Sequence, residues 1–215
     1  MKPAADTRPG DTRPVIAAYG DSLMEGWGLA NAAEALPARI EAELARLGKD
    51  ARVLNFGISG ETAPEGLERL EEVLAAQPVA AILEFGANDC YQGVPVEETR
   101  AALQAMIAGL KGAGVKVLLA GWRTTEDLFS RYEGDPDLAG LLPLAPPAFN
   151  AKYVRAFNAM HAELAREHGL ALIGHILDPL GEDARHFQAD AVHPNARGTQ
   201  KLAEALAPLL LPLLG

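Results

Sequence analysis

The sequence predicts an α/β fold of three layers, in which helices cover both faces of a parallel sheet of about five strands. Strand-like and helix-like segments alternate along the chain. The strand-like segments are short, continuous apolar runs, which is typical of strands that are buried on both faces. Strand-helix-strand units close with a right-handed crossover, so this alternation favours a parallel sheet.

The individual elements follow from apolar runs and from helical spacing. The helix near 34–47 is the clearest, because Leu36, Ile40 and Leu44 recur at helical spacing and Gly48 ends the segment. The predicted strands are 15–19, 52–56, 79–85, 115–120 and 170–173. The predicted helices lie near 34–47, 64–75, 96–112, 149–168 and 195–207.

These elements are expected to form a single domain over 15–215, preceded by a flexible tail over 1–14. The tail is polar and contains the tetrapeptide Asp-Thr-Arg-Pro twice. A long segment at 121–148 is rich in Gly, Pro and Asp, whereas most connections in compact domains have about 4–6 residues. Its leucines favour an ordered, flap-like loop.

Charge and composition restrict the partners that the protein can have. The net charge of -10 and the pI near 5.0 argue against nucleic acid and against an anionic membrane surface. No apolar run approaches the ~20 residues of a membrane helix, so no stable membrane insertion is expected. We expect a small-molecule substrate and a monomer or small homo-oligomer. The expected compartment is the cytoplasm, or the periplasm or exterior if a signal peptide was removed.

Polar or glycine-containing turns follow the first three predicted strands. They are Gly20-Asp21-Ser22-Leu23, Gly57-Ile58-Ser59-Gly60-Glu61-Thr62 and Gly86-Ala87-Asn88-Asp89. Because the carboxyl ends of parallel strands open onto one edge of a sheet, these turns should converge there. Ligand sites of α/β proteins lie at this edge.

The converging residues include the groups that acyl transfer requires. Ser22 offers a nucleophilic Oγ, while the backbone N–H groups of Ser22 and Gly60 and the Asn88 amide can donate hydrogen bonds to an oxyanion. A base is available near the other end of the chain, in the segment Asp190-Ala191-Val192-His193-Pro194. The spacing of Asp190 and His193 lets the carboxylate reach one ring nitrogen while the other faces the serine.

Each candidate also has a purely structural interpretation. Ser22 could be the N-cap of a following helix, and Asp190 could cap the last helix. Gly60 and Asn88 could be ordinary turn residues. His186 is the only plausible rival base.

Two aromatic residues close to these turns are candidate substrate contacts. Trp27 follows Ser22 and Tyr91 follows Asn88, so both could touch an acyl or aryl group, although packing in the core or at the rim would also explain them. The single cysteine, Cys90, excludes an intrachain disulfide. No spacing resembles a metal site, and no phosphate-binding glycine loop is present.

In these motifs the chain resembles the SGNH (GDSL-motif) hydrolase family, of the bacterial arylesterase, acyl-thioesterase I and lysophospholipase type. Gly20-Asp21-Ser22-Leu23 matches its nucleophile block, Gly60 and Asn88 match its second and third blocks, and the segment from Asp190 to Pro194 matches its fifth. The G-x-S-x-G elbow of α/β-hydrolases is absent, because Met24 stands where its second glycine would be. The resemblance implies a flavodoxin-like strand order and no metal or organic cofactor.

The chain departs from the family pattern at two positions of the third block. Ala87 stands where a second glycine is usual, and Cys90 stands where a glycine is common. The expected function is a serine hydrolase that cleaves carboxylic (acyl or aryl) esters or thioesters through an acyl-enzyme, with Ser22, His193 and Asp190 as triad. The alternatives are a carbohydrate acetylesterase and a non-catalytic, flavodoxin-like ligand-binding module.

Overall fold

The structure, a computed structural model, describes residues 11–127 and 149–215. The first ten residues of the predicted tail and most of the predicted flap-like loop at 121–148 therefore lie outside the described residues. All five predicted strands are present, each within two residues of its expected ends. They are β1 Val15–Gly20, β2 Arg52–Gly57, β3 Ala80–Glu84, β4 Lys116–Ala120 and β5 Ala171–Ile173.

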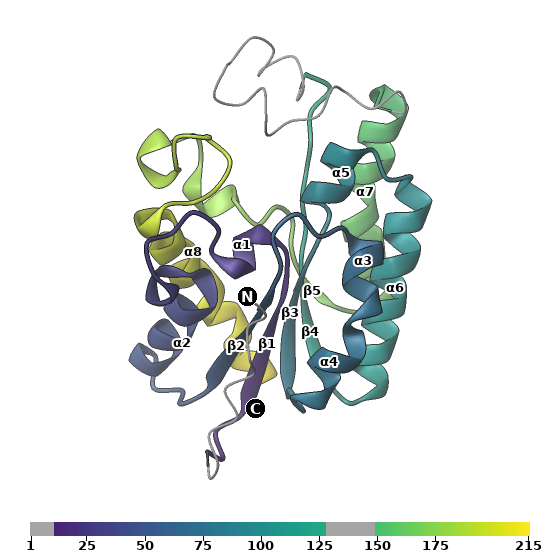
Figure 1. Ribbon diagram of the computed structural model, residues 1–215. Helices are drawn as coiled ribbons and strands as arrows, with labels where there is room; N and C mark the ends of the chain where they lie inside the picture. Colours follow the sequence, from purple (N-terminus) through teal and green to yellow (C-terminus); the bar gives the residue numbers. More distant parts are fainter. Residues whose placement is uncertain (1–10, 128–148) are drawn as a thin grey trace.

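The strands form one parallel sheet with the order β2-β1-β3-β4-β5 (Figure 1). This is the flavodoxin-like order, and it confirms the predicted fold class. The strand order reverses between β1 and β3, so a crevice opens at their carboxyl ends. Gly20 at the end of β1 pairs in register with Gly57 of β2 and Glu84 of β3, which aligns the turns that follow these strands.

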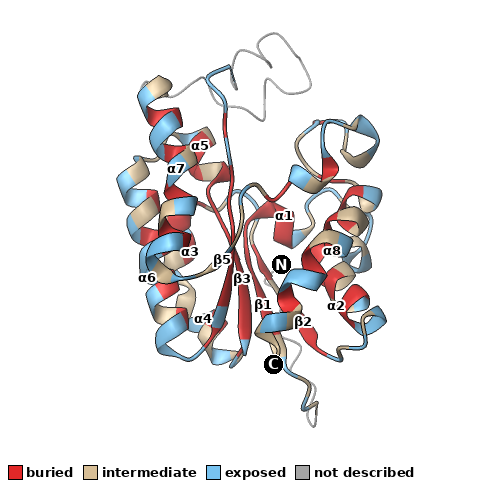
Figure 2. Ribbon diagram, turned by 180° about the vertical axis from the view of Figure 1, so that it is seen from behind, coloured by how far each residue is buried: buried red, intermediate tan, exposed pale blue. Residues whose placement is uncertain are grey.

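Helices cover both faces of the sheet (Figures 1 and 2). One layer consists of α2 Leu36–Arg46 and α8 Ala196–Leu210. The other consists of α3 Ala63–Glu68, α4 Leu70–Ala75, α6 Val96–Gly112 and α7 Ala151–His168. Two short helices, α1 Ser22–Glu25 and α5 Ala87–Gln92, stand at the carboxyl edge of the sheet. Among the described residues, none of the helices has the length and apolar character needed to span a bilayer.

The helix predicted over 64–75 is in fact two helices, α3 and α4, which meet at Arg69. The backbone of Arg69 leaves the helical region, with φ −109° and ψ 16°. Its guanidinium pairs with Glu61 and donates to the carbonyls of Gly20 and Phe56 at the ends of β1 and β2. These contacts compensate for the interrupted helix and tie the turn after β2 to the sheet.

The core lies on both faces of the central strands, as the continuous apolar runs predicted (Figure 2). Ile16 to Tyr19 of β1 and Ala80 to Leu83 of β3 have no exposed surface. The stripe of Leu36, Ile40 and Leu44 on α2 is fully buried as well. The sheet is thus a rigid base for the turns at its carboxyl edge.

Candidate active site

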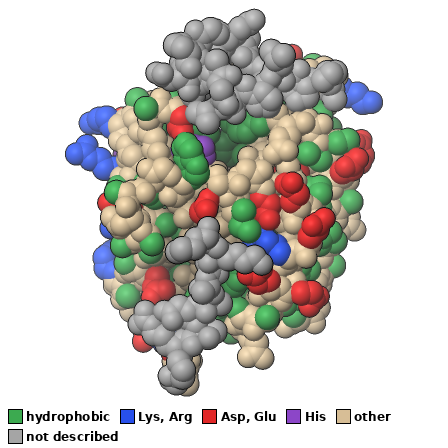
Figure 3. All heavy atoms as spheres, viewed as in Figure 1, with side chains coloured by type: hydrophobic (Ala, Val, Ile, Leu, Met, Phe, Trp, Pro, Cys, Tyr) green, Lys and Arg blue, Asp and Glu red, His purple; other side chains and the backbone are tan. Residues whose placement is uncertain are grey.

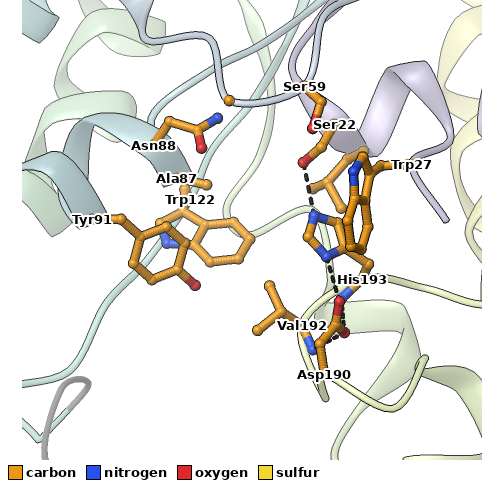
Figure 4. Close-up of a pocket in the computed structure, with 12 residues that line it drawn as sticks. Ser22, Trp27, Ser59, Ala87, Asn88, Tyr91, Trp122, Asp190, Val192 and His193 are labelled. Carbon is orange, nitrogen blue, oxygen red and sulfur yellow. Dashed lines mark hydrogen bonds and ion pairs between the residues drawn. The ribbon is translucent and has the colours of Figure 1, made fainter. Parts of the chain in front are cut away.

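Ser22, His193 and Asp190 lie together at the carboxyl edge of the sheet (Figure 4). The Ser22 hydroxyl lies 2.9 Å from His193 Nε2, and His193 Nδ1 lies 2.7 Å from Asp190 Oδ2. The serine comes from the end of β1, whereas the other two come from the loop before α8. The structure therefore joins, in one line of hydrogen bonds, three residues that are 171 positions apart at their extremes.

Ser22 is the first residue of α1 and is not its N-cap. Asp21 is the N-cap, because its side chain accepts a hydrogen bond from the Leu23 N–H at 3.0 Å. The capping interpretation of Ser22 is therefore wrong. A residue in the first turn of a helix has no intrahelical partner for its N–H, so the Ser22 N–H can serve as a donor to a ligand.

Asp190 is held in place by the backbone of its own loop. Its Oδ1 accepts hydrogen bonds from the N–H groups of Val192 and His193, both at 2.9 Å. The loop can curl in this way because Ala191 takes the left-handed conformation, with φ 56°. Burial tends to raise the pKa of Asp190, but the hydrogen bonds from His193 and from these N–H groups outweigh it, so the pKa is lowered. The cap of α8 is Asn195, and Asp190 has no such role.

Gly60 and Asn88 lie at the same cavity as Ser22. Gly60 has φ +83°, where L side chains are strained, although open space surrounds the position. Asn88 Nδ2 donates to the Glu61 carbonyl at 3.0 Å and to Asp21 Oδ2 at 3.1 Å. The amide nitrogen is thereby fixed between the turns after β1 and β2. An oxyanion would have to share one of these two N–H groups.

The cavity has a volume of about 210 Å³ and apolar walls. Trp27 and Tyr91, the two predicted contact residues, both line it. The Trp27 ring also covers the His193 ring, with 4.8 Å between centroids. In the space-filling view a hollow with hydrophobic side chains and a histidine at its margin lies at this end of the molecule (Figure 3).

Sequence reasoning missed Trp122 and Val192, which also line the cavity. Trp122 is the second residue after β4 and is only 6% exposed. Its indole contacts the rings of Tyr91 and His175 edge-on. The ring centroids lie 6.2 Å apart for Tyr91 and 4.8 Å apart for His175. The rule that turns after parallel strands converge would have found Trp122, but that segment was assigned to the long loop instead.

Trp122, Tyr91 and Val192 line this cavity and also a second, neighbouring one of about 570 Å³. Figure 4 shows Tyr91 and Trp122 on the side of the cavity opposite Ser22 and His193. The side of the cavity opposite Ser22 is therefore an aromatic wall (Figure 4).

The remaining sequence candidates lie apart from the triad. His186 contacts Asp183 at 3.7 Å and does not line the cavity, so it is not placed as a base for Ser22. Cys90 is buried, and burial raises the pKa of its thiol to about 11, which favours a packing role. Within residues 11–127 and 149–215, no group of three or more His, Cys, Asp or Glu side chains could hold a metal ion.

Comparison with known proteins agrees with this geometry. Residues 18–201 match the model of the GDSL-like Lipase/Acylhydrolase family. The chain is 30% identical over 196 residues to Esterase TesA of Pseudomonas aeruginosa, which covers 91% of this chain and 87% of that protein. It is 27% identical to Thioesterase 1/protease 1/lysophospholipase L1 of Escherichia coli, over 91% of this chain and 82% of that protein.

Solved structures lead to the same family. The crystal structure of TesA superposes with a TM-score of 0.75 at 29% identity, covering 93% of this chain and 99% of that chain. The SGNH-hydrolase family esterase AlinE4 has a TM-score of 0.69 at 33% identity, covering 95% and 98%. Together with the Ser22–His193 hydrogen bond and the five-stranded sheet, these matches show that the chain is a carboxylic ester hydrolase of the GDSL-like lipase/acylhydrolase family.

Proposed function

We propose that the protein hydrolyses esters and thioesters of short and medium acyl chains through an acyl-enzyme on Ser22. The observation that carries the proposal is the unbroken line of hydrogen bonds from Ser22 through His193 to Asp190 at the wall of an apolar cavity. The names of the relatives, an esterase and a thioesterase/lysophospholipase, support both oxygen and thiol esters as substrates.

In the first step His193 Nε2 takes the Ser22 proton as Oγ attacks the acyl carbonyl carbon. Asp190 stays ionised beside Nδ1, so it stabilises the imidazolium that forms and fixes the ring tautomer. His193 then returns the proton to the leaving alkoxide or thiolate as the bond to the acyl group breaks. Water repeats the attack on the acyl-enzyme with the same base and regenerates Ser22.

The oxyanion donors that we propose are the N–H groups of Ser22 and Gly60 and the Asn88 amide. The first two are backbone groups at the cavity, and the third comes from α5 on the facing side. In a site with little water, such donors act strongly on the charge that develops in the transition state.

The aromatic wall sets the acyl length that we expect. The cavity is small, about 210 Å³, and Trp122 and Tyr91 line the side opposite Ser22 (Figure 4). This supports short and medium acyl chains over long ones. The largely apolar side chains around the cavity also favour acyl or aryl groups over a polar sugar.

A series of p-nitrophenyl esters and matched thioesters tests this function. We expect kcat/KM to rise from acetyl to about hexanoyl and to fall for dodecanoyl, which would have to displace Trp122. In Trp122→Ala the two cavities join, and the ratio of dodecanoyl to hexanoyl kcat/KM should rise about tenfold or more, because each buried methylene is worth about a factor of four.

Trp27→Ala is the matched control for that series, because Trp27 lines the first cavity and not the second. It should not lengthen the preferred chain. A flat profile from acetyl to dodecanoyl in the unmodified protein would contradict the proposed acyl pocket, and absence of hydrolysis of every ester and thioester would contradict the function itself.

Asn88→Ala is expected to lower kcat by about 10² to 10³ and to change KM little, because an oxyanion donor acts mainly in the transition state. Steady-state kinetics on p-nitrophenyl hexanoate measures both constants. Asn31→Ala serves as control, since Asn31 caps a short helical turn outside the cavity. A loss below threefold in Asn88→Ala would remove Asn88 from the oxyanion site.

A further inference from the structure

Two buried carboxyl groups, on Asp21 and Glu84, lie beneath the candidate active site, and the mechanism above uses neither. Glu84 is the last residue of β3 and Asp21 follows the last residue of β1. Glu84 is 1% exposed and Asp21 is 0% exposed. Burying two acids side by side is unfavourable unless they share a proton.

The sequence around them makes room for this contact. Gly20 pairs in register with Glu84, and a Cβ at position 20 would stand 2.6 Å from Glu84 Oε2. The glycine of the nucleophile turn therefore lets the Glu84 carboxyl reach the end of β1. There the Asp21 N–H donates to Glu84 Oε2 at 3.4 Å, so the two buried carboxyl groups lie next to each other.

Two buried carboxyl groups this close can hydrogen-bond to each other only if one of them carries a proton. The Asp21 carboxylate accepts hydrogen bonds from the backbone N–H of Leu23 and the side-chain N–H of Asn88, which favours its ionised form. Burial and the charge of Asp21 raise the pKa of Glu84 well above its ordinary value, whereas burial raises the pKa of Asp21 only to about 6. The hydrogen bonds to Asp21 and the direction of the Glu84 shift both favour a proton on Glu84.

The charged groups around the pair do not remove this need for a proton. Asp89 of α5 is a further buried acid, and burial raises its pKa to about 6. Arg69 reaches the Gly20 carbonyl, but its guanidinium is paired with Glu61. The positive charge of a protonated His193 ring favours the ionised form of Asp21 and so lowers the pKa of Asp21.

The pair is connected to the reaction through Asn88. Asp21 Oδ2 accepts the Asn88 amide N–H at 3.1 Å, which turns the amide nitrogen, and not its oxygen, toward this edge of the site. When an oxyanion also accepts a hydrogen bond from that N–H, Asp21 would still accept a hydrogen bond from the Glu84 O–H. The pair then carries one negative charge near the oxyanion instead of two.

We propose that Glu84 is a positioning residue for the hydrolysis, whose carboxyl O–H holds Asp21 so that Asp21 keeps the Asn88 amide oriented as an oxyanion donor. This inference rests on the proposed roles of Ser22 and Asn88.

Two variants of Glu84 test it. Glu84→Gln keeps a neutral donor of the same shape and should retain kcat within about threefold. Glu84→Leu removes the donor and should lower kcat by about 10- to 100-fold while KM changes less than about twofold, since the effect is on the transition state. Glu43→Gln is the matched control, because Glu43 is also buried but is paired with Arg46 on α2 and should have wild-type kinetics.

The proton on Glu84 can be observed without any substrate. In a titration upward from about pH 7, where Asp21 and Asp89 are ionised because their pKa values are about 6, we expect an infrared C=O band of a protonated carboxyl in the unmodified protein, which disappears as Glu84 ionises. The band should be absent in Glu84→Gln and present in Glu43→Gln. This readout remains informative if Glu84→Leu fails to fold.

The pH profile gives a second readout. Protonated Glu84 supports the reaction below its pKa, so kcat should fall as the pH rises through that value and a second buried charge appears. Glu84→Gln should remove this alkaline fall. Burial raises the pKa of the Cys90 thiol to about 11, and this thiol is common to all variants, so its titration cannot account for a difference between them.

Equal kcat in Glu84→Leu and Glu84→Gln, or absence of the infrared band, would overturn the inference. A fluorophosphonate probe separates this failure from that of the proposed function. If the probe labels Ser22 in the unmodified protein and Glu84→Leu reacts at the same rate, the inference alone fails. If Ser22 is not labelled, the proposed function fails.

Discussion

Ser22→Ala is expected to abolish ester hydrolysis, with a loss of about 10⁶ in kcat if the triad acts as a unit, as it does in a serine protease. The change removes only the Oγ that lies 2.9 Å from His193 Nε2. Asp21 supplies the cap of α1, so the helix keeps its N-terminal hydrogen bond without the hydroxyl. The thermal midpoint of unfolding should therefore stay within a few degrees of the wild-type value.

The measurement combines hydrolysis of p-nitrophenyl hexanoate with labelling by a fluorophosphonate. The unmodified protein should carry the label on the peptide that contains residue 22, and Ser22→Ala should carry none. Ser59→Ala is the matched control, because Ser59 lines the same cavity and its side chain has no role in the proposed reaction. Residual turnover within tenfold of wild type, or a label elsewhere in the cavity, would exclude Ser22 as the nucleophile.

The strands, and the meeting of Ser22, His193 and Asp190 at one edge of the sheet, could be predicted because their signals are local. Buried parallel strands appear as continuous apolar runs, and all five were found in this way. Ser22 and Asn88 each lie in the turn that follows such a run, and the spacing of Asp190 and His193 is a property of one turn. Parallel order then brings these segments to one edge without further information.

The features that were missed depend on contacts between distant segments. Helix α5 is only six residues long, too short for a helical pattern to emerge from the sequence. The break at Arg69 depends on carbonyls at the ends of β1 and β2. In the sequence, Glu84 is a single acidic residue near the end of an apolar run. Only the register of β3 against β1 places its carboxyl beside Asp21. Contacts of this kind can be predicted only once the strand order and register of the sheet are known.

The same register explains why glycine stands at the start of the nucleophile turn. A side chain at position 20 would collide with the Glu84 carboxyl and with the side chain of Met24. Gly20 is therefore a packing requirement of β1 against β3 and α1. The motif around Ser22 combines this structural constraint with the chemical one on the serine.

Asp190→Asn is expected to lower kcat by about 10⁴, the loss seen when an asparagine replaces the triad aspartate of a serine protease. The hydrogen bonds of the loop explain why. Asp190 Oδ1 accepts two backbone N–H groups, so an asparagine must place its oxygen there. Its amide nitrogen then faces His193 Nδ1, which has to become an acceptor. The ring proton moves to Nε2, and the nitrogen that should take the Ser22 proton is already occupied.

The loss should persist across the pH range. In the unmodified protein the lowered pKa of Asp190 keeps the carboxylate ionised at neutral pH and for some distance below it, whereas asparagine has no ionised form at any pH. The kcat profile of p-nitrophenyl hexanoate hydrolysis from about pH 5 to 9 measures this. Asp183→Asn is a matched control with the same spacing to a histidine, because Asp183 contacts His186 away from the cavity. Equal losses in the two variants would mean that the fold of the loop, and not the tautomer of His193, accounts for the effect of Asp190.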